Sequence, residues 1–267
     1  MKRDVGAELE VDITAPTTLE FQIAVAPHPN TEVSESLSFV LDGKPLQPLE
    51  ISGVHGNRIH KLDVPVGNLK VDYAATIVGQ TAPAPVTEYD LSMYLRPSRY
   101  AEADKFFGFA ATEFGSYIDS TTLLEKVSFW VGSRLNYVPC SSDPIDGAVD
   151  TLLSGAGVCR DFAHLVVALL RAVNVPARVV SVYAPGLYPM DFHAVAEALI
   201  GGQWFVVDAT LLAPREGLVR IATGRDAADT AFLSTYGSVV SLDELQVYAV
   251  IDGDLPTEDV TSLMHIR

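Results

Sequence analysis

Cys159 is the residue at which the sequence most clearly predicts chemistry. It lies in the segment 155–161, with the sequence GAGVCRD, after a glycine loop and at the first turn of a predicted helix. Helix N-termini present unpaired backbone N–H groups and a partial positive charge. A thiol placed there ionises more easily, and the same N–H groups can receive a developing oxyanion. The segment therefore predicts a thiol nucleophile, which needs a base and an acid that orients the base.

A predicted β-hairpin supplies both partners. The two glycines at 201–202 separate two apolar segments and are typical of a two-residue hairpin turn. When Ile200 pairs with Gln203, His193 and Asp208 become diagonal neighbours on one face, because side chains alternate between faces. We therefore expect the imidazole and the carboxylate to lie within reach of each other. A shift of one residue in the pairing would send them to opposite faces.

These three side chains together predict thiol acyl-transfer chemistry. Cys159 attacks a carboxamide carbon as the thiolate, and His193 holds the thiolate as an ion pair and then protonates the leaving amine. Asp208 fixes the tautomer of His193 and stabilises its charged form. The backbone N–H of Cys159 is one oxyanion donor, and Asn136 or Tyr137 is a candidate for the second.

Three motifs, in their order and spacing, resemble those of the transglutaminase-like superfamily. They are GVCRDFAHL at 157–165, DFHA at 191–194 and VDAT at 207–210. More narrowly, the chain resembles the microbial branch provisionally described as cysteine proteases. The resemblance of the core covers residues 90–215, and the β-rich first third is similar to the N-terminal domain that often precedes this core.

The resemblance implies a papain-like core, acyl transfer through a thioester without a metal, and a catalytic triad of Cys159, His193 and Asp208. One departure concerns the second residue after the histidine. Family members often have tryptophan there, whereas this chain has Val195. The departure leaves the triad intact but bears on the shape of the acyl channel and hence on the substrate. Nothing in the chain matches the calcium sites of animal transglutaminases.

The surrounding sequence predicts an α+β protein with two domains. Residues 1–82 alternate between apolar and polar positions, with frequent turn residues, and predict a small β-sandwich. The stretch 80–85 predicts a linker, and residues 83–267 are assigned to a transglutaminase-like catalytic domain. There we expect a buried cysteine-bearing helix packed on an antiparallel β-sheet. The predicted helices are 101–118, 121–134, 147–153 and 158–173, and the predicted strands are 177–183, 193–200, 204–209 and 239–251.

Other polar residues near these elements have simpler interpretations. His28, His55 and His60 lie in or beside turns, and we expect solvated loop residues rather than ligands. We expect His164 to be a buried structural histidine that hydrogen-bonds neighbouring elements, because it points away from any site that Cys159 lines.

Residues beside the nucleophile are expected to support it. Arg160 and Asp161 would cap or brace the start of the cysteine helix, where an acid is favourable. Glu197 would be a structural support. Cys140 lies in a loop and is expected to be incidental.

A zinc site is an alternative interpretation of the same cysteine, histidine and aspartate residues. Cys159 and His164 do not share a helix face, however, and the chain has no Cys-x-x-Cys pair. We therefore expect no metal and no cofactor.

Composition disfavours several function classes. The formal net charge of −16 argues against binding to nucleic acid or to an anionic membrane. The N-terminus has two basic residues but no apolar stretch behind them, and no apolar run approaches membrane-spanning length. With only two cysteines, we expect a reducing compartment and a cytoplasmic location. The oligomeric state is not indicated.

The sequence thus favours an enzyme that acts on amide or peptide bonds of a peptide or protein substrate. Water as the second reactant makes it a peptidase or amidase, whereas an amine makes it a transglutaminase. We favour hydrolysis, because no amine-binding feature is visible. The alternative is a non-catalytic peptide-binding module on the same fold, and thiol reactivity distinguishes the two.

Overall fold

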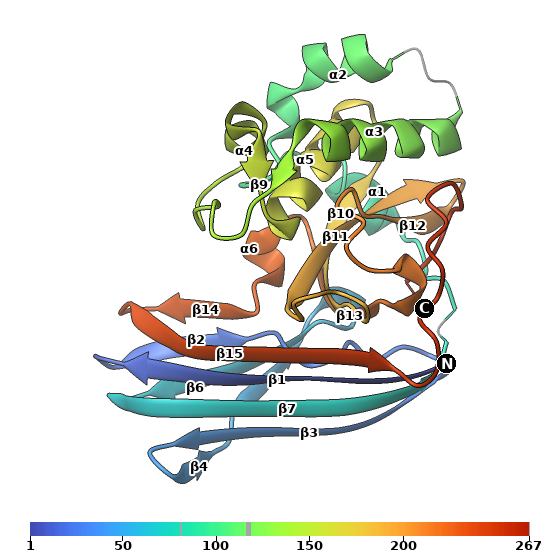
Figure 1. Ribbon diagram of the computed structural model, residues 1–267. Coiled ribbons are helices and arrows are strands. Elements are labelled where there is room, and N and C mark those ends of the chain that lie inside the picture. The colour runs from blue at the N-terminus through green and yellow to red at the C-terminus, as the bar shows by residue number, and fades with distance from the viewer. Residues whose placement is uncertain (81, 116–118, 267) are drawn as a thin grey trace.

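The computed structural model describes residues 1–80, 82–115 and 119–266, and it confirms the α+β class. Helices gather on one side of the molecule and a large β-sandwich forms the other (Figure 1). The helices are α1 (Glu88–Met93), α2 (Phe107–Phe114), α3 (Ser120–Arg134), α4 (Ala148–Ser154), α5 (Cys159–Ala172) and α6 (Ala227–Thr230). Short 3-10 turns are η1 (Val54–Gly56), η2 (Ala103–Lys105) and η3 (Arg215–Gly217).

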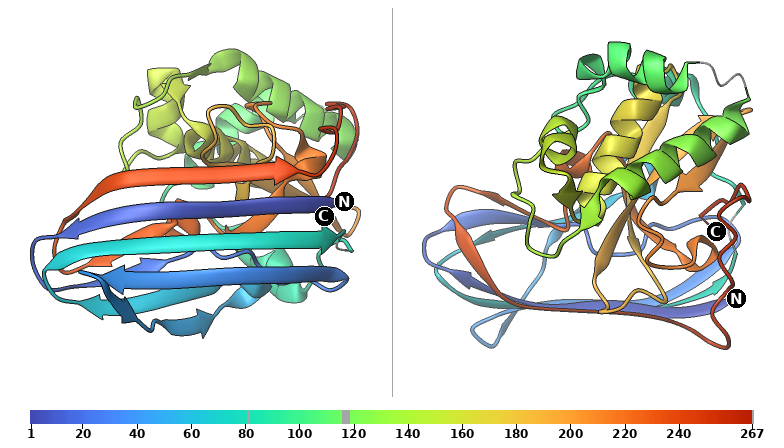
Figure 2. Two further views of the ribbon diagram at one scale, coloured as in Figure 1. Left: turned by 60° about the horizontal axis from the view of Figure 1, so that its bottom comes forward. Right: turned by 45° about the horizontal axis from the view of Figure 1, so that its top comes forward.

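The sandwich consists of two antiparallel sheets. In spatial order, the strands of the larger sheet are β15 (Val240–Ile251), β1 (Lys2–Ile13), β7 (Gly67–Gly79), β3 (Thr31–Leu41) and β4 (Lys44–Leu46). Those of the smaller sheet are β14 (Leu233–Tyr236), β2 (Thr17–Phe21), β6 (Arg58–Val64) and β5 (Leu49–Ser52). Figure 2 (left) shows the larger sheet as one broad layer.

Alternating apolar residues hold the two sheets together. Val5 and Leu9 of β1 are buried in the same cluster as Leu19 and Phe21 of β2. Because alternate side chains of a strand point to opposite faces, this pattern gives each sheet one buried face. The cluster continues into Ile221 of the catalytic part. The sandwich and the catalytic part therefore share buried apolar surface.

Two strands of the sandwich come from the C-terminal part of the chain. β15 pairs with β1 along its length, and β14 pairs with β2 (Figure 1). The expectation that every residue after 82 belongs to the catalytic domain is therefore wrong for these strands. The physical reason for this pairing is that, without β15, the edge of β1 would present a row of unpaired backbone groups. The sequence predicted a strand over 239–251 but not its partner.

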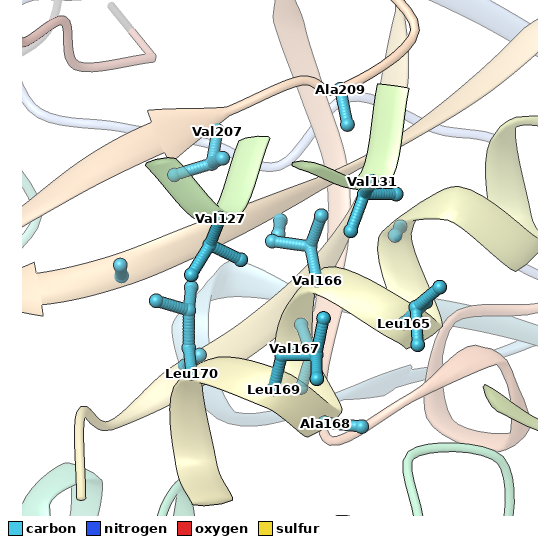
Figure 3. Close-up of a cluster of buried hydrophobic side chains, with 14 of the residues drawn as sticks. Val127, Val131, Leu165, Val166, Val167, Ala168, Leu169, Leu170, Val207 and Ala209 are labelled. Atoms are coloured by element: carbon cyan, nitrogen blue, oxygen red, sulfur yellow. The ribbon is translucent and has the colours of Figure 1, made fainter. Parts of the chain in front are cut away.

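A third sheet carries the cysteine helix. Its strands, in order, are β12 (Gln203–Val207), β11 (Phe192–Ile200), β10 (Ala177–Tyr183) and β13 (Val219–Gly224), all antiparallel. Residues of α5 from Asp161 to Ala172 are buried. Figure 3 shows Val166 of α5 in the same buried cluster as Val127 of α3 and Val207, the last residue of β12. The expectation of a buried cysteine-bearing helix on an antiparallel sheet is confirmed.

Two other expectations need correction. His60 is not a solvated loop residue: it lies on β6, is 3% exposed and packs with Phe39, with ring centroids 6.2 Å apart. It alternates inward with the neighbouring apolar residues of its strand. The helix predicted over 101–118 is divided into η2 and α2, and residues 116–118 lie outside the described residues, as does residue 81 of the predicted linker.

No helix in the described parts of the chain has the length and apolarity needed to cross a membrane.

Candidate active site

Cys159 is the first residue of α5. The Oδ2 of Asp161 accepts a hydrogen bond of 2.8 Å from the Val158 backbone N–H and closes the first turn. This turn needs glycine at 157, because a Cβ there would lie 2.7 Å from the Cβ of Asp161. The glycine loop therefore allows Asp161 to fold back, and the closed turn exposes the N–H of Cys159 at the start of a helix. Asp161 caps the helix, as expected.

His193 and Asp208 meet on the predicted hairpin. β11 pairs with β12 from Ile200–Gln203 to Ala196–Val207, which is the predicted register. The Nε2 of His193 lies 2.8 Å from the Oδ2 of Asp208, and both side chains are buried. The pair is therefore shielded from solvent. In the protein interior a hydrogen bond is electrostatically stronger than in water.

Hydrogen bonds and the packing of its chain neighbours fix the orientation of Asp208. Its Oδ1 accepts hydrogen bonds from the backbone N–H of Thr210 at 2.8 Å and from the Thr210 hydroxyl at 2.7 Å. Val207 and Ala209, its chain neighbours, lie in the buried cluster that α3 and α5 form (Figure 3). This anchoring presents Oδ2 to the imidazole in one orientation. Thr210 is a positioning residue that the sequence analysis did not identify, although an aspartate that accepts from the backbone two residues on is a known turn signal.

The charge of Asp208 controls the ionisation of His193. Burial lowers the pKa of His193, but the charge of Asp208, the hydrogen bond to it and the Cys159 side chain raise that pKa to about 10. Burial raises the pKa of Asp208, whereas His193 and Thr210 lower it and prevail. At neutral pH the site therefore holds an imidazolium between a carboxylate and a sulfur atom.

The orientation of the imidazole suits a thiol–imidazole pair. Because Nε2 faces Asp208, Nδ1 is the ring nitrogen left for Cys159, and Nδ1 has no other hydrogen-bond partner within the described residues. The Cys159 side chain interacts directly with the imidazole. The structure thus brings together all three residues that the sequence assigned to the site.

Tyr137 lies beside the nucleophile. It belongs to the short strand β8 (Asn136–Tyr137), which pairs in parallel with β9 (Ala156–Gly157) just before Cys159. The Tyr137 hydroxyl lies close enough to Cys159 for both its backbone N–H and its side chain to influence the pKa of the phenol. Burial and the nearby Cys159 raise the pKa of Tyr137 to about 12, so the phenol keeps its proton. Asn136 directs its amide to the carbonyl of Gly155 at 3.5 Å, so the geometry favours Tyr137 as the second donor.

A cleft of about 650 Å³ opens at the thiol and the imidazole. Its walls are mostly apolar and come from the catalytic sheet and from the segment that leads into β14. Its lining includes Cys159, His193, Asp191, Phe192, Phe232 and Leu245. Phe192 stacks on Phe232, with ring centroids 5.0 Å apart. The segment that leads into β14, in the C-terminal part of the chain, therefore forms one wall of the cleft.

A polar brace holds the loop before the cysteine helix. Arg160 donates to the hydroxyl of Ser142 and to the carbonyl of Asp143, at 2.5 and 2.9 Å. The Ser142 hydroxyl donates to Asp161 at 2.9 Å. The bracing role expected of Arg160 is confirmed, whereas Ser142 was missed because its contact spans residues that are distant in sequence.

His164 is a buried structural residue, as expected. Its Nε2 accepts a hydrogen bond of 3.1 Å from the Ala227 backbone N–H, and its ring stacks on Tyr100. The support role of Glu197 is also confirmed: its carboxylate pairs with Arg178 at 2.7 Å and with Arg220 at 2.6 Å. The described residues contain no group of three cysteine, histidine or acidic side chains that could hold a metal ion.

Comparisons with known proteins identify a family and similar chains. A family model described as the transglutaminase-like superfamily matches residues 112–209. A protein of Cytophaga hutchinsonii, provisionally described as a cysteine protease, has a crystal structure with a TM-score of 0.90. It is 34% identical, and the match covers 98% of this chain and 96% of that one. An uncharacterised protein of Mycobacterium leprae is 26% identical over 234 residues, which are 84% of this chain and 74% of that protein.

Proposed function

The chain belongs to the transglutaminase-like superfamily, and on that premise we propose that it cleaves amide or peptide bonds through a thioester on Cys159. The observation that carries the proposal is the buried 2.8 Å contact between His193 and Asp208 beside a cysteine at a helix N-terminus. A nucleophile, a base and an orienting acid in this relation support covalent acyl transfer. The proposed substrate is a peptide or a protein, and the two free thiols are consistent with a reducing, cytoplasmic setting.

In the first half-reaction, the thiolate of Cys159 attacks the amide carbon and its electron pair forms the C–S bond. The carbonyl oxygen becomes an oxyanion, which accepts hydrogen bonds from the Cys159 N–H and the Tyr137 hydroxyl. The intermediate collapses, the C–N bond breaks, and the imidazolium of His193 gives its proton to the leaving amine. An acyl thioester remains on Cys159.

In the second half-reaction, His193 takes a proton from the incoming nucleophile. Attack by water on the thioester carbon breaks the C–S bond, releases a carboxylic acid and restores the Cys159 thiolate beside the imidazolium of His193. Asp208 stabilises the imidazolium each time it forms, because its buried carboxylate stays ionised beside the ring. Hydrolysis is the favoured outcome.

Attack by an amine is the second candidate, and Asp191 favours it. This carboxylate lines the cleft two residues before His193. A carboxylate at that point attracts a cationic alkylamine and so raises its concentration near the thioester. Transamidation would then compete with hydrolysis.

A mixed peptide library analysed by mass spectrometry tests the proposal. We expect new peptide termini with the native protein, and amine adducts in addition when an alkylamine is supplied. Cys159→Ala is expected to remove every product, whereas Cys140→Ala, the matched loss of a thiol, retains them. Peptides that bind the native protein without any product would instead support the non-catalytic binding module.

A further inference from the structure

The strand β14 is the outermost strand of the smaller sheet, on the side of the sandwich that faces the catalytic part (Figure 1). It pairs with β2 in antiparallel register along one of its sides. Its first two residues, Leu233 and Ser234, line the same cleft as Cys159 and His193. The strand therefore borders the space in which the nucleophile acts.

The pairing with β2 fixes which backbone groups of β14 point outward. The backbone N–H of Gln22 donates to the carbonyl of Phe232 at 3.0 Å, and this pair continues the register of the two strands. Hydrogen-bonded pairs alternate with non-bonded pairs in an antiparallel ladder. Ser234 therefore bonds β2, whereas the N–H and C=O groups of Leu233 and Thr235 point away from it. Within the described residues, no further strand and no backbone group pairs with these outward groups.

The other outer strands of the three larger sheets are protected against pairing with another chain. In β12, the N–H of Val206 donates to the carbonyl of Met264 at 2.8 Å. In β13, the carbonyl of Arg220 accepts from the N–H of Ala26 at 3.0 Å. The strands β4, β5 and β15 carry charged residues or proline, which disfavour such pairing: Lys44, Pro45, Glu50 and Asp243. β14, with the sequence LSTY, carries neither, and is suited to accept a further strand.

The inner face of this edge is apolar. Leu233 packs against the buried cluster of the sandwich, and Phe192, Phe232 and Leu245 line the cleft with it. A residue that pairs with Leu233 would place its side chain on the same face, because directly opposed side chains of paired strands lie on one side of a sheet. The next side chain of the added strand would point to the other face. The edge therefore suits a segment with apolar residues at alternate positions.

We propose that β14 holds the substrate of Cys159 as an added antiparallel strand. The proposal rests on the proposed function, since it specifies the substrate class: an extended segment with apolar residues at alternate positions. Hydrogen bonds to the backbone of Leu233 and Thr235 align the segment, and its apolar side chains enter the cleft. A second copy of the chain fits less well, because a cleft of about 650 Å³ admits a short extended segment but not the edge of a folded domain.

Two N-methylated peptides test the proposal, with Cys159→Ala as the protein so that binding is measured without turnover. The parent probe is an acetylated, amidated pentapeptide of alternating threonine and leucine, with leucine at its second and fourth positions. In the proposed pairing the leucine N–H groups point to β14 and the threonine N–H groups point away. We expect saturable binding of the parent below about 5 mM, measured by isothermal titration calorimetry.

The two methylation patterns should differ in their effect. Methylation of both leucine nitrogens removes the donors to β14 and should weaken binding at least about tenfold. Methylation of the third and fifth nitrogens, which belong to threonines, is the matched control and should change binding less than about twofold. Absence of binding by the parent, equal effects of the two patterns, or the reverse order would overturn the proposal.

Two matched proline variants, also made in the Cys159→Ala protein, give an independent check. Thr235 is exposed and its N–H points outward, so proline there removes no bond to β2. Ser52 is an exposed residue of β5, at the opposite edge of the same sheet. Its N–H also points outward, because the N–H of Gly53 bonds Asn57 in continuation of the register of β5 and β6. We expect Thr235→Pro to weaken binding of the parent probe at least about tenfold and Ser52→Pro to leave it unchanged.

The outcomes separate the edge of β14 from the proposed function. Thermal unfolding checks that both proline variants fold, and binding that survives Thr235→Pro in a folded protein would contradict the proposal. A native dimer that Thr235→Pro dissociates, in sedimentation, would assign the edge to a second copy instead. Binding with the predicted pattern, but no product from the peptide library, would contradict the proposed function alone. Products from the library together with equal effects of the two methylation patterns would contradict the added strand alone.

Discussion

The Nε2 of His193 lies 2.8 Å from the Oδ2 of Asp208, and both side chains are buried. This contact decides which nitrogen of the ring is left for the nucleophile. It also supplies the negative charge that keeps the imidazole protonated at neutral pH. The proposed chemistry therefore depends on a carboxylate that acts through the imidazole.

Asp208→Asn should lower both turnover and the pKa of His193. Folding raises the pKa of His193 to about 10, so the imidazolium is stabilised at neutral pH and is lost as the pH rises through that value. Removing the carboxylate charge moves this loss to lower pH. We expect kcat to fall by about 10²–10⁴. Titration of the His193 signals by NMR measures the first effect, and an unchanged titration would contradict our assignment of the charge.

Tyr137→Phe should slow catalysis without weakening substrate binding. The hydroxyl is expected to bind an oxyanion that exists only after attack, so its loss should lower kcat by about 10²–10³ and leave KM nearly unchanged. Tyr248→Phe is the matched control, because Tyr248 is 38% exposed and Tyr137 is 41% exposed. Steady-state kinetics separate the two parameters, and a change in KM alone would assign Tyr137 to substrate binding instead.

Glu197→Gln should destabilise the fold. Burial raises the pKa of Glu197, but Arg178 and Arg220 lower it to about 2. Removing the charge leaves two buried guanidinium groups without their partner, which costs about 3–5 kcal/mol. Glu8→Gln, at an exposed position of β1, should stay within about 0.5 kcal/mol of the native protein. Urea unfolding at pH 7 measures both values.

The lowered pKa of Glu197 also predicts how the stability of the protein changes with pH. A carboxyl whose pKa is lowered by folding stabilises the protein above its ordinary pKa of 4.5 and loses that contribution as the pH falls toward 2. The difference in unfolding free energy between native protein and Glu197→Gln should therefore shrink over this interval. A difference that stays constant down to pH 2 would mean that the carboxyl is not paired as described.

Residues 1–82 should not fold alone. β15 pairs with β1 along its length, and Val247 and Ala249 of β15 belong to the buried cluster of the sandwich. Without them, β1 becomes an exposed edge with an incomplete core. We expect the isolated segment to aggregate or to lack a cooperative unfolding transition. The same segment joined by a flexible linker to residues 233–251 is expected to recover more structure, as circular dichroism and thermal unfolding would show.

Local patterns were sufficient to predict the His193–Asp208 pair. A two-residue turn at 201–202 fixes the pairing of the strands that flank it, and the pairing fixes which side chains share a face. The helix N-terminus at Cys159 is also a local feature, since its capping residue, Asp161, is two positions away. These parts of the site depend on residues that are close in sequence.

The features that were missed depend on residues far apart in sequence. The pairing of β15 with β1 joins the two ends of the chain, and alternation within β15 does not reveal its partner. The same holds for Ser142, which contacts Asp161 across the loop before α5. His60 was misassigned because a nearby turn suggested exposure, whereas the β6 register turns it inward.

The most direct test of the account is the rate of iodoacetamide labelling of each cysteine at pH 7, with mass spectrometry locating the label. Cys140 is an exposed free thiol and serves as the internal reference. If Cys159 forms an ion pair with His193, it should react at least about tenfold faster than Cys140, and His193→Ala should remove this advantage. Thermal unfolding of the variant checks that its fold is retained. Equal labelling of the two cysteines in the native protein would contradict an activated thiol and with it the proposed enzyme.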